Sequence, residues 1–249
     1  MLVLVLTARR FLACRPFEAK RRYFQTLILV KYKVATFFGL LTLIVALCTT
    51  IAAKDTHELN ESEAREALNL LSHLGYWTGD AEAASDEPTY FATLAFQRVV
   101  GIAPTGRLTQ TELRLLRRAE PLRVRSPQSF HVEIDVKRQI LFLVEPGGVT
   151  RFIVPISTGN GVAFRINGHT ANGRTPLGTF QVYRKIDGWH DSSLGNMFYS
   201  SYIYRGIAVH GSRIFAKTPS THGCISIPLL AAISLSKEMP MGTVVTVYD

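Results

Sequence analysis

Cysteine is scarce in this sequence of 249 residues, which contains only Cys14, Cys48 and Cys224. The last two hundred residues hold a single thiol, so no disulfide framework can form within them. A zinc site made of Cys224, His210 and His222 has workable ligand types, but no further cysteine or paired acids accompany it. Phosphate-loop signatures are also missing, because "STGNG" and "TPLGTF" lack both the P-loop lysine and the G-x-G-x-x-G pattern. Cys224 is therefore a packed thiol, a zinc ligand or a nucleophile.

Acidic residues are nearly absent from the N-terminus. Residues 1–53 contain eight lysines and arginines and one acid, Glu18, whereas residues 54–249 contain twenty basic and eighteen acidic residues. Of the formal net charge of +9, seven units belong to the first segment and two to the rest of the chain. A nearly neutral folded part gives little support to nucleic-acid binding.

Charge is missing altogether from residues 34–53, "VATFFGLLTLIVALCTTIAA". As a helix, this segment spans a hydrocarbon core of about 30 Å, and it lacks the polar face of a helix in a soluble protein. Lysines precede it and acids follow it, which predicts a basic cytoplasmic segment, 1–33, and the bulk of the chain in the periplasm or cell-wall space. We expect a single-pass anchor in the cytoplasmic (inner) membrane. Secretion after signal cleavage is the alternative.

Residues 60–118 show the periodicity of helices. "ESEAREALNLLSHLGYW" and "PTYFATLAFQRVVGI" each place apolar residues on one side, as in an amphipathic helix. A third helix is predicted in "APTGRLTQTELRLLRR", where Thr109 and Glu112 have capping-box spacing. Residues 119–129 contain two prolines and no periodicity, which is typical of a linker. Three short helices bury little surface, so this part is expected to be an adaptor module.

Residues 130–249 change to a period of two. "FHVEIDVKRQILFLVEPGG" alternates apolar and polar residues and breaks at Lys137-Arg138, as a hairpin does. Further strands are predicted in "VTRFIVPISTG", "GTFQVYRKI", "SYIYRGIAVHG" and "GTVVTVYD", and one helix in "PLLAAISLSKEM". The predicted fold class is mainly β, an antiparallel sandwich or barrel-like domain with a few helices. Trp189-His190-Asp191 is interpreted as a solvated polar loop.

Cys224 has the neighbours that a nucleophilic thiol needs. A free cysteine titrates near pH 8.5, and an adjacent imidazole can take up its proton and return it to the leaving group. His222 lies two residues before Cys224, so both side chains point to one face of an extended segment. His210 ends the predicted strand "YRGIAVH". Gly211 and Gly223 leave backbone N–H groups accessible for an oxyanion hole. This pattern favours a Cys/His acyl-transfer site.

"AVHGS" followed by "STHGCISIP" resembles the signature of the L,D-transpeptidase (YkuD) catalytic domain family. "HVEIDVKRQILFLVEPG", "FIVPISTG", "GRTPLGTF" and "GNMFYSSYIYRGIAVHG" precede it in the family's order, so that the resemblance covers residues 130–249. It implies that Cys224 is the nucleophile and His210 the base. The residues implied to form the oxyanion hole or to position the reacting groups are His222, Gly223, Gly211, Ser212 and Thr221.

One position departs from the family. Two residues past the cysteine the family usually has Arg or Asn, and here Ser226 can supply neither that reach nor that charge. We expect Ser226, Tyr199 and Tyr204 to contact the substrate.

The implied reaction is attack on the L,D peptide bond before the terminal D-Ala of a peptidoglycan stem tetrapeptide, with transfer of the acyl group to an amine. It requires no metal or organic cofactor, and carbapenems are expected as covalent inhibitors. An L,D-carboxypeptidase and a non-catalytic peptidoglycan-binding protein are the alternatives.

The helical part carries a second resemblance. "LGYWTGD", "LAFQRVVGI" and "PTGRLTQTEL" are similar, in order, to landmarks of the peptidoglycan-binding domain type 1, although "AEAASDEP" departs from its usual loop. The resemblance implies that residues 60–118 bind peptidoglycan. A three-helix spacer without a ligand is the alternative.

Overall fold

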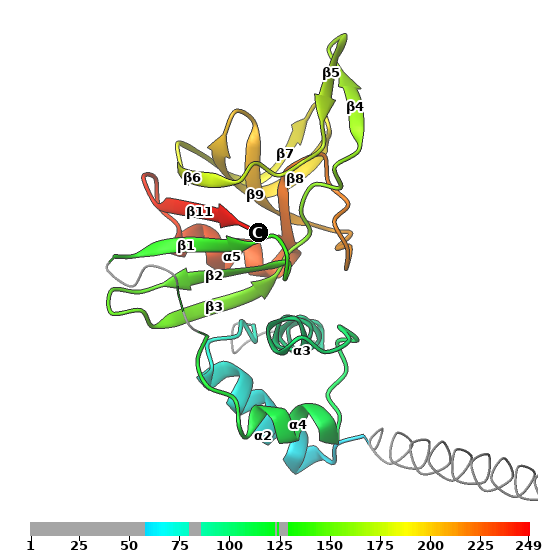
Figure 1. The fold of residues 1–249 in the computed structure, drawn as a ribbon, viewed down its shortest axis with the longest axis vertical. Coiled ribbons are helices and arrows are strands. Elements are labelled where there is room, and N and C mark those ends of the chain that lie inside the picture. Colours follow the sequence, from blue (N-terminus) through cyan, green and yellow to red (C-terminus); the bar gives the residue numbers. More distant parts are fainter. Residues whose placement is uncertain (1–57, 80–85, 123, 125–128) are drawn as a thin grey trace, which may run out of the picture. The chain divides into compact units, whose positions relative to one another are not determined.

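The computed structural model describes residues 58–79, 86–122, 124 and 129–249 (Figure 1). The chain divides into two compact units, Met1–Asp55 and Thr56–Asp249, and every described residue belongs to the second. The predicted basic segment 1–33 and apolar segment 34–53 lie outside the described residues. Within the described ranges, no helix is both long enough and apolar enough to cross a membrane.

The predicted helical region contains α2 (Glu61–His73), α3 (Glu87–Val100) and α4 (Gln110–Leu116). The capping box predicted from Thr109 and Glu112 is confirmed at the start of α4. Asn60 and Glu63 form a second capping box at the start of α2. α3 is capped at its C-terminus by Gly101, whose φ of 76° is a left-handed conformation that glycine adopts at little cost. Local sequence signals therefore account for these helix boundaries.

The remaining described residues form a mainly β structure, as predicted, with three sheets. The first sheet has the order β3-β2-β1-β11-β6, with β1 (His131–Asp135), β2 (Ile140–Val144), β3 (Thr150–Pro155), β6 (Gly178–Gln181) and β11 (Val244–Tyr248). The second has the order β10-β9-β8-β7, with β7 (Arg184–Ser192), β8 (Gly195–Tyr204), β9 (Ile207–Ser212) and β10 (Ile225–Pro228). The third is a hairpin of β4 (Ala163–Ile166) and β5 (His169–Asn172), which projects from the sheets in Figure 1.

Most strand pairs are antiparallel, and the predicted hairpin at Lys137-Arg138 joins β1 to β2. The prediction did not include two parallel pairs, β1 with β11 and β9 with β10. The second of these pairs places the predicted catalytic residues, with His210 in β9 and Cys224 directly before β10. The chain between β9 and β10 therefore leaves the sheet and returns to it, because a hairpin joins only antiparallel strands.

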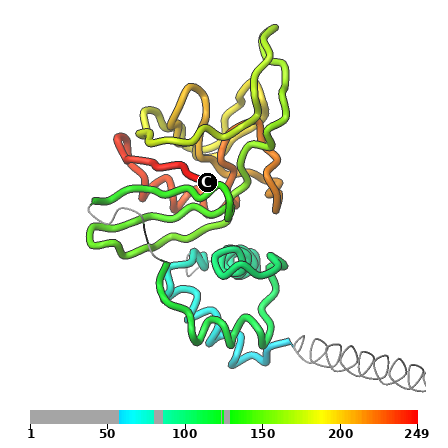
Figure 2. Tube along the Cα trace, in the orientation of Figure 1, coloured from blue at the N-terminus to red at the C-terminus, as the bar shows by residue number. Residues whose placement is uncertain are grey.

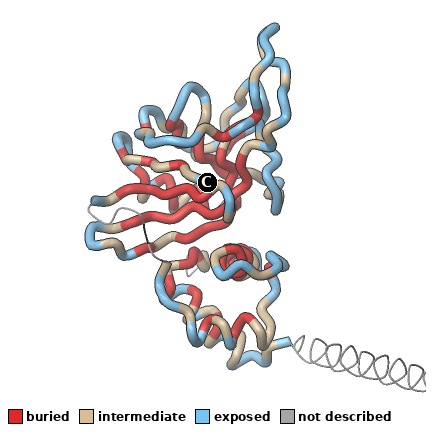
Figure 3. The backbone as a smooth tube through the Cα atoms, viewed as in Figure 1, coloured by how far each residue is buried: buried red, intermediate tan, exposed pale blue. Residues whose placement is uncertain are grey.

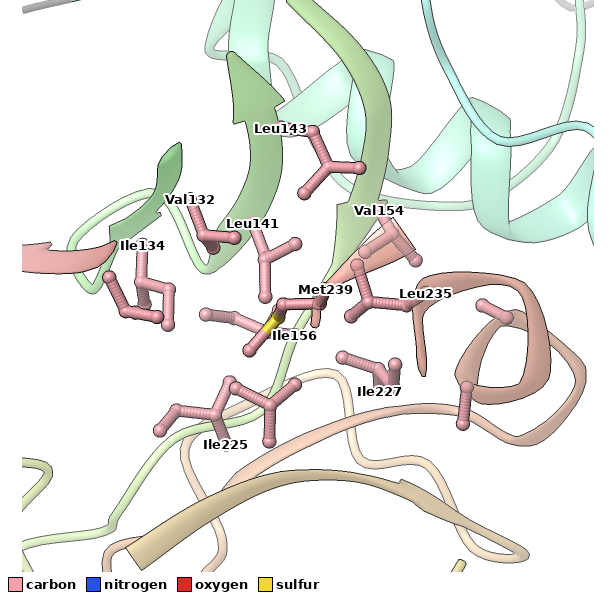
Figure 4. Packing of buried hydrophobic residues seen from close by; sticks show 14 of the residues in the cluster. Val132, Ile134, Leu141, Leu143, Val154, Ile156, Ile225, Ile227, Leu235 and Met239 are labelled. Atoms are coloured by element: carbon pink, nitrogen blue, oxygen red, sulfur yellow. The ribbon is translucent and has the colours of Figure 1, made fainter. Parts of the chain in front are cut away.

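A large apolar core lies between the two larger sheets and α5 (Leu229–Glu238). Figure 4 shows Leu141 and Val154 of the first sheet together with Ile225 and Ile227 of β10 and Leu235 of α5. Burying side chains of this size stabilises the fold by about 1.5–3 kcal/mol each. The core thereby holds one face of the second sheet and leaves its other face for the site.

β2 is buried on both faces, which explains its uninterrupted apolar sequence "ILFLV". Leu141 and Leu143 point into the core between the sheets, whereas Ile140, Phe142 and Val144 join a second cluster with residues of α2, α3 and α4. Figure 3 shows buried residues in the sheet and in these helices, and Figure 2 shows α3, seen nearly end-on, next to β3, on which it packs. The helices and the first sheet therefore share a hydrophobic core.

Candidate active site

The second sheet presents one face to the core and the other to a cleft. On β9, Val209 lies in the core and His210 lines the cleft. On β10, Ile225 lies in the core, while Cys224 before it and Ser226 after it line the cleft. This alternation follows from the two-residue period of a strand. The strand predicted through "YRGIAVH" is confirmed only from Ile207 onward, and it continues through Ser212. Tyr204 ends β8, and Arg205 and Gly206 form the turn between the two strands.

The cleft has a volume of about 560 Å³ and is lined by residues of the four strands and of the segment before β10. Of the predicted site residues, the cleft brings together Cys224, His210, His222, Thr221, Ser212 and Ser226. The predicted residues that do not line it are Gly211, Gly223, Tyr199 and Tyr204.

His210 is buried, with 8% of its surface exposed. Its Nδ1 lies 3.0 Å from the carbonyl oxygen of Gly211. Because a carbonyl can only accept, Nδ1 carries the proton and Nε2 is the basic nitrogen. Burial lowers the pKa of His210 below its ordinary 6.5, and the nearby His190 adds to this effect, while the bond to Gly211 opposes it. The imidazole is therefore neutral at pH 7, the form that a general base requires.

Cys224 is half-buried and packs against Met197, Tyr202 and Ala208. Its thiol donates a weak hydrogen bond to the carbonyl oxygen of Gly206 at 3.8 Å. Burial raises the pKa of the thiol above its ordinary value, although a hydrogen bond from the backbone of Ala208 opposes this. The thiol is neutral in this environment, so it needs a proton acceptor before it can act as a nucleophile.

Cys224 and His210 are diagonal neighbours on adjacent strands. The parallel register pairs Ile225 with Val209 and Ser226 with His210. Cys224 precedes Ile225, so its side chain lies on the same face as His210, two residues before Ser226, which pairs with His210. The fold thus turns two residues from separate strands toward one cleft.

The turn before Cys224 is shaped by Thr221 and Gly223. Thr221 Oγ1 donates to the carbonyl oxygen of Cys224 at 2.6 Å and accepts from the N–H of Gly223 at 3.1 Å. Gly223 has a φ of 124°, and a Cβ there would lie 2.9 Å from Ile207 Cδ1 and 3.1 Å from the carbonyl oxygen of Arg174. The position therefore demands glycine. The Gly223 N–H, expected to be accessible to an oxyanion, is engaged by Thr221.

Gly211 and Ser212 follow the base in β9, where Gly211 faces α5 and Ser212 lines the cleft. A Cβ on Gly211 would lie 2.8 Å from Cβ of Ala232 in α5, so this glycine permits close packing of the helix. Ser212 Oγ donates to the carbonyl oxygen of Ile214 at 2.9 Å. The carbonyl oxygen that orients His210 belongs to Gly211.

Of the three predicted substrate contacts, only Ser226 lines the cleft. It is 4% exposed, and its Oγ has no hydrogen-bond partner among the described residues. Because buried hydroxyl groups are normally paired, this one is suited to bind a substrate atom. Tyr199, with a φ of 47°, lies at an irregularity of β8 and packs against the core. Tyr204 packs against Phe180, with ring centroids 5.2 Å apart.

The structure gives no support to the alternative of a zinc site. Across the ranges that the structure describes, no group of three or more His, Cys, Asp and Glu side chains is placed to hold a metal ion. His222 is exposed at the edge of the cleft, and its ring contacts Phe164 of β4 with centroids 4.6 Å apart.

The interpretation of Trp189-His190-Asp191 as a loop is wrong, because these residues lie in β7. His190 lines the cleft, and its Nε2 is 3.0 Å from Tyr202 Oη, while its Nδ1 is buried without a partner among the described residues. Burial lowers the pKa of His190, with a further contribution from Arg184, and Asp191 opposes the shift. β7 lies at a sheet edge and reads "RKIDGWHDS", so it lacks the apolar alternation that would have revealed it.

The loop between β9 and β10 is also held from outside the sheet. Arg98 of α3 donates to the carbonyl oxygen of Lys217 in this loop. Phe215 of the loop packs against Phe91 of α3, with ring centroids 5.1 Å apart. α3 therefore supports the segment that leads to Cys224, a role that the sequence analysis did not predict.

A mainly β domain with a cysteine thiol and a neutral imidazole facing one cleft has the chemistry of cysteine-dependent acyl transfer. The model of the L,D-transpeptidase catalytic domain family (YkuD) matches residues 129–247. The L,D-transpeptidase of Xylanimonas cellulosilytica (its residues 123–326) is 34% identical, with a TM-score of 0.69 over 78% of this chain and 96% of that one. The chain therefore belongs to the L,D-transpeptidase (YkuD) family and is an enzyme, which leaves the non-catalytic alternative without support.

Two further solved structures are more distant. The L,D-transpeptidase (Yku) of Stackebrandtia nassauensis is 20% identical, with a TM-score of 0.45 over 78% of this chain and 94% of that one. An L,D-transpeptidase of Mycobacterium tuberculosis is 20% identical, with a TM-score of 0.38 over 49% of this chain and 58% of that one. The comparison with curated proteins gave no match.

Proposed function

We propose that Cys224 is the nucleophile and His210 the general base of this L,D-transpeptidase. The acyl donor is a peptidoglycan stem tetrapeptide, cleaved at the L,D bond before its terminal D-Ala. The observation that carries the proposal is the position of Cys224 and His210 on one face of the β9–β10 pair, with His210 Nε2 unprotonated.

The reaction has two halves. His210 Nε2 takes the thiol proton as Cys224 Sγ bonds to the carbonyl carbon of the third residue. The C–N bond then breaks, and the nitrogen of D-Ala leaves with the proton from His210, which yields a thioester. In the second half an acceptor amine attacks the thioester carbon, gives its proton to His210, and displaces the Cys224 thiolate, which regains that proton. The raised thiol pKa and lowered imidazole pKa favour a neutral pair at rest, so proton transfer accompanies attack.

The products of the full chain with a disaccharide-tetrapeptide, measured by mass spectrometry beside Cys224→Ala, test this proposal. Dimers that have lost one D-Ala, and that the variant does not form, are expected. Tripeptide monomer alone would identify a hydrolase with the same thiol chemistry. Equal product in the variant would overturn the role of Cys224. A carbapenem is likewise expected to add its mass to Cys224 in the wild type and to leave Cys224→Ala unmodified.

We also propose that the region 60–118 binds peptidoglycan, on the strength of its resemblance to the peptidoglycan-binding domain type 1. Gln97, of the "FQ" landmark, is buried and joins α3 to the following turn and to α4. Its Nε2 donates to Thr105 Oγ1 at 2.9 Å and to Glu112 Oε1 at 2.9 Å, and its Oε1 accepts from the N–H of Gly106 at 2.8 Å. These bonds support a structural role for the landmark. Co-sedimentation of the Cys224→Ala chain with purified sacculi tests binding, and no co-sedimentation would favour a spacer.

We propose, finally, that residues 34–53 anchor the chain in the cytoplasmic membrane with the catalytic domain outside. The support is the uncharged run of 20 residues and the basic segment before it. Membrane fractionation with N-terminal sequencing tests this. A soluble protein that begins near residue 54 would indicate a cleaved signal instead.

A further inference from the structure

Arg184 lies in the same cross-strand row as Cys224. The register pairs Arg184 with Tyr202 and Tyr202 with Ala208. β9 and β10 pair Val209 with Ile225, so the residue beside Ala208 in the same register is Cys224. Residues in one row of a sheet point to the same face, and both Arg184 and Cys224 line the cleft. Three strand spacings of about 4.8 Å separate their backbones by about 14 Å.

Arg184 is held over the floor of the cleft. Its guanidinium carbon lies 3.9 Å from the centroid of the Tyr202 ring. Tyr202 is buried, packs near Cys224, and its Oη is 3.0 Å from His190 Nε2. The contact with the ring holds the guanidinium over Tyr202, while its N–H groups at the edge are left to bind a planar anion. The long side chain also extends part of the way from β7 toward the thiol.

The charge of Arg184 is not balanced by a neighbouring acid. Among the described residues that line the cleft, Arg184 is the only lysine or arginine. The acid lining the cleft, Asp191, forms no ion pair with it, and no other described carboxylate does. Ser226 adds an unpartnered hydroxyl on the opposite side of the cleft. The cleft therefore offers an arginine at its β7 edge and, at its β10 edge, a hydroxyl two residues from the thiol, as a polar substrate with a carboxylate requires.

We propose that Arg184 is a specificity-determining residue that binds a carboxylate of the acyl donor. The inference rests on the proposed function, because it takes Cys224 as the point of attack. The carboxylate has two possible sources. If it is the C-terminal carboxylate of the donor, it leaves with D-Ala, and Arg184 acts in acylation alone. If it is on the side chain of the third residue, it stays in the thioester, and Arg184 acts in both halves of the reaction.

The test combines a protein variant with a donor variant in the full chain. Arg184→Gln removes the charge and keeps a polar side chain. Arg213→Gln is the matched control, because Arg213 also stacks on an aromatic ring, 4.5 Å from Trp189, but does not line the cleft. The donors are a tetrapeptide with both carboxylates free, one amidated at the C-terminus, and one amidated on the third side chain. The kcat/KM for release of the fourth residue is measured for each pair, together with the Kd in a Cys224→Ala background.

The wild type and Arg213→Gln are expected to prefer the donor with both carboxylates free over one of the two amidated donors, by about tenfold to a hundredfold in kcat/KM. Arg184→Gln should lose that preference and accept both donors with similar kcat/KM. The amide that is discriminated identifies the source of the carboxylate. An unchanged preference in Arg184→Gln, or no preference in the wild type, would overturn the inference.

The binding measurement separates this inference from the proposed function. A wild type that releases no fourth residue from any donor would refute the function. The Kd values in the Cys224→Ala background would still decide whether Arg184 distinguishes carboxylate from amide.

Discussion

Replacement of Arg98 by methionine measures how strongly α3 supports the segment that leads to Cys224. Arg98 is 9% exposed, and it donates to the carbonyl oxygens of Gln139 at 2.7 Å, Ile156 at 3.0 Å and Lys217. Burial lowers its pKa to about 10, so that it keeps its charge at pH 7. Arg98→Met would leave these carbonyl groups without their donor.

The magnitude follows from two opposing effects. Each bond from a charged donor contributes about 1.5–3 kcal/mol to stability. The variant also relieves the cost of burying the guanidinium, which amounts to several kcal/mol, so the net loss is smaller than the sum of the bonds. We expect the free energy of unfolding to fall by about 2–4 kcal/mol. For a folded unit of this size, the fall in Tm is roughly 5–15 °C.

Thermal and urea unfolding of the full chain provide the measurement, with Arg65→Met as the control. Arg65 is exposed and forms only a surface ion pair with Glu61, which is worth about 0.5 kcal/mol or less. Hydrogen exchange of residues 213–220 should become faster in Arg98→Met and stay unchanged in Arg65→Met. Equal stability of the two variants would refute the reasoning, because it would mean that other contacts hold the loop.

Three further predictions concern the site itself. The acid limb of kcat/KM should have its midpoint below pH 6.5, because burial lowers the pKa of His210 and only the neutral ring accepts a proton; a midpoint above 6.5 would contradict the neutral base. Alkylation of Cys224 by iodoacetamide, followed on its peptide by mass spectrometry, should have its midpoint above pH 9.0, and a lower value would indicate a thiolate–imidazolium pair. Gly223→Ala should lower stability by about 1–3 kcal/mol and reduce activity. Gly223→Ala combines backbone strain at a positive φ with a close contact to Ile207. The control Gly147→Ala, at a φ of 93° and in open space, carries the strain alone. Equal losses of stability in the two variants would contradict the contact.

Elements with local signals were predictable from the sequence. The capping box of Thr109 and Glu112 marks the start of α4, and the polar break at Lys137-Arg138 marks a hairpin. The apolar residues before His210 place it in a strand. Each of these signals lies within a few residues of the structure it specifies, so that one sequence is enough to read it.

The identity of the side chains that line the cleft was less predictable, because it depends on strand register. Arg184 and His190 belong to an edge strand with charged residues and a glycine in its sequence, which resembles a loop. Their approach to Cys224 requires the pairings β7–β8, β8–β9 and β9–β10 at once. A shift by one residue in any of these pairs would turn the side chains to the opposite face. No local pattern contains that information.

The boundary drawn at residues 119–129 cuts through a continuous core. Ile140, Phe142 and Val144 of β2 are fully buried, and they are covered by helices that precede this boundary in the sequence. A chain that began at residue 129 would expose that face of the first sheet to water, and it would also remove Arg98 from the carbonyl groups at the end of the sheet and in the loop. Exposure of even these three side chains costs several kcal/mol, a large part of the stability of an ordinary domain. The sequence can suggest two modules because their periodicities differ, but the packing of α3 makes the helices part of the scaffold that holds Cys224.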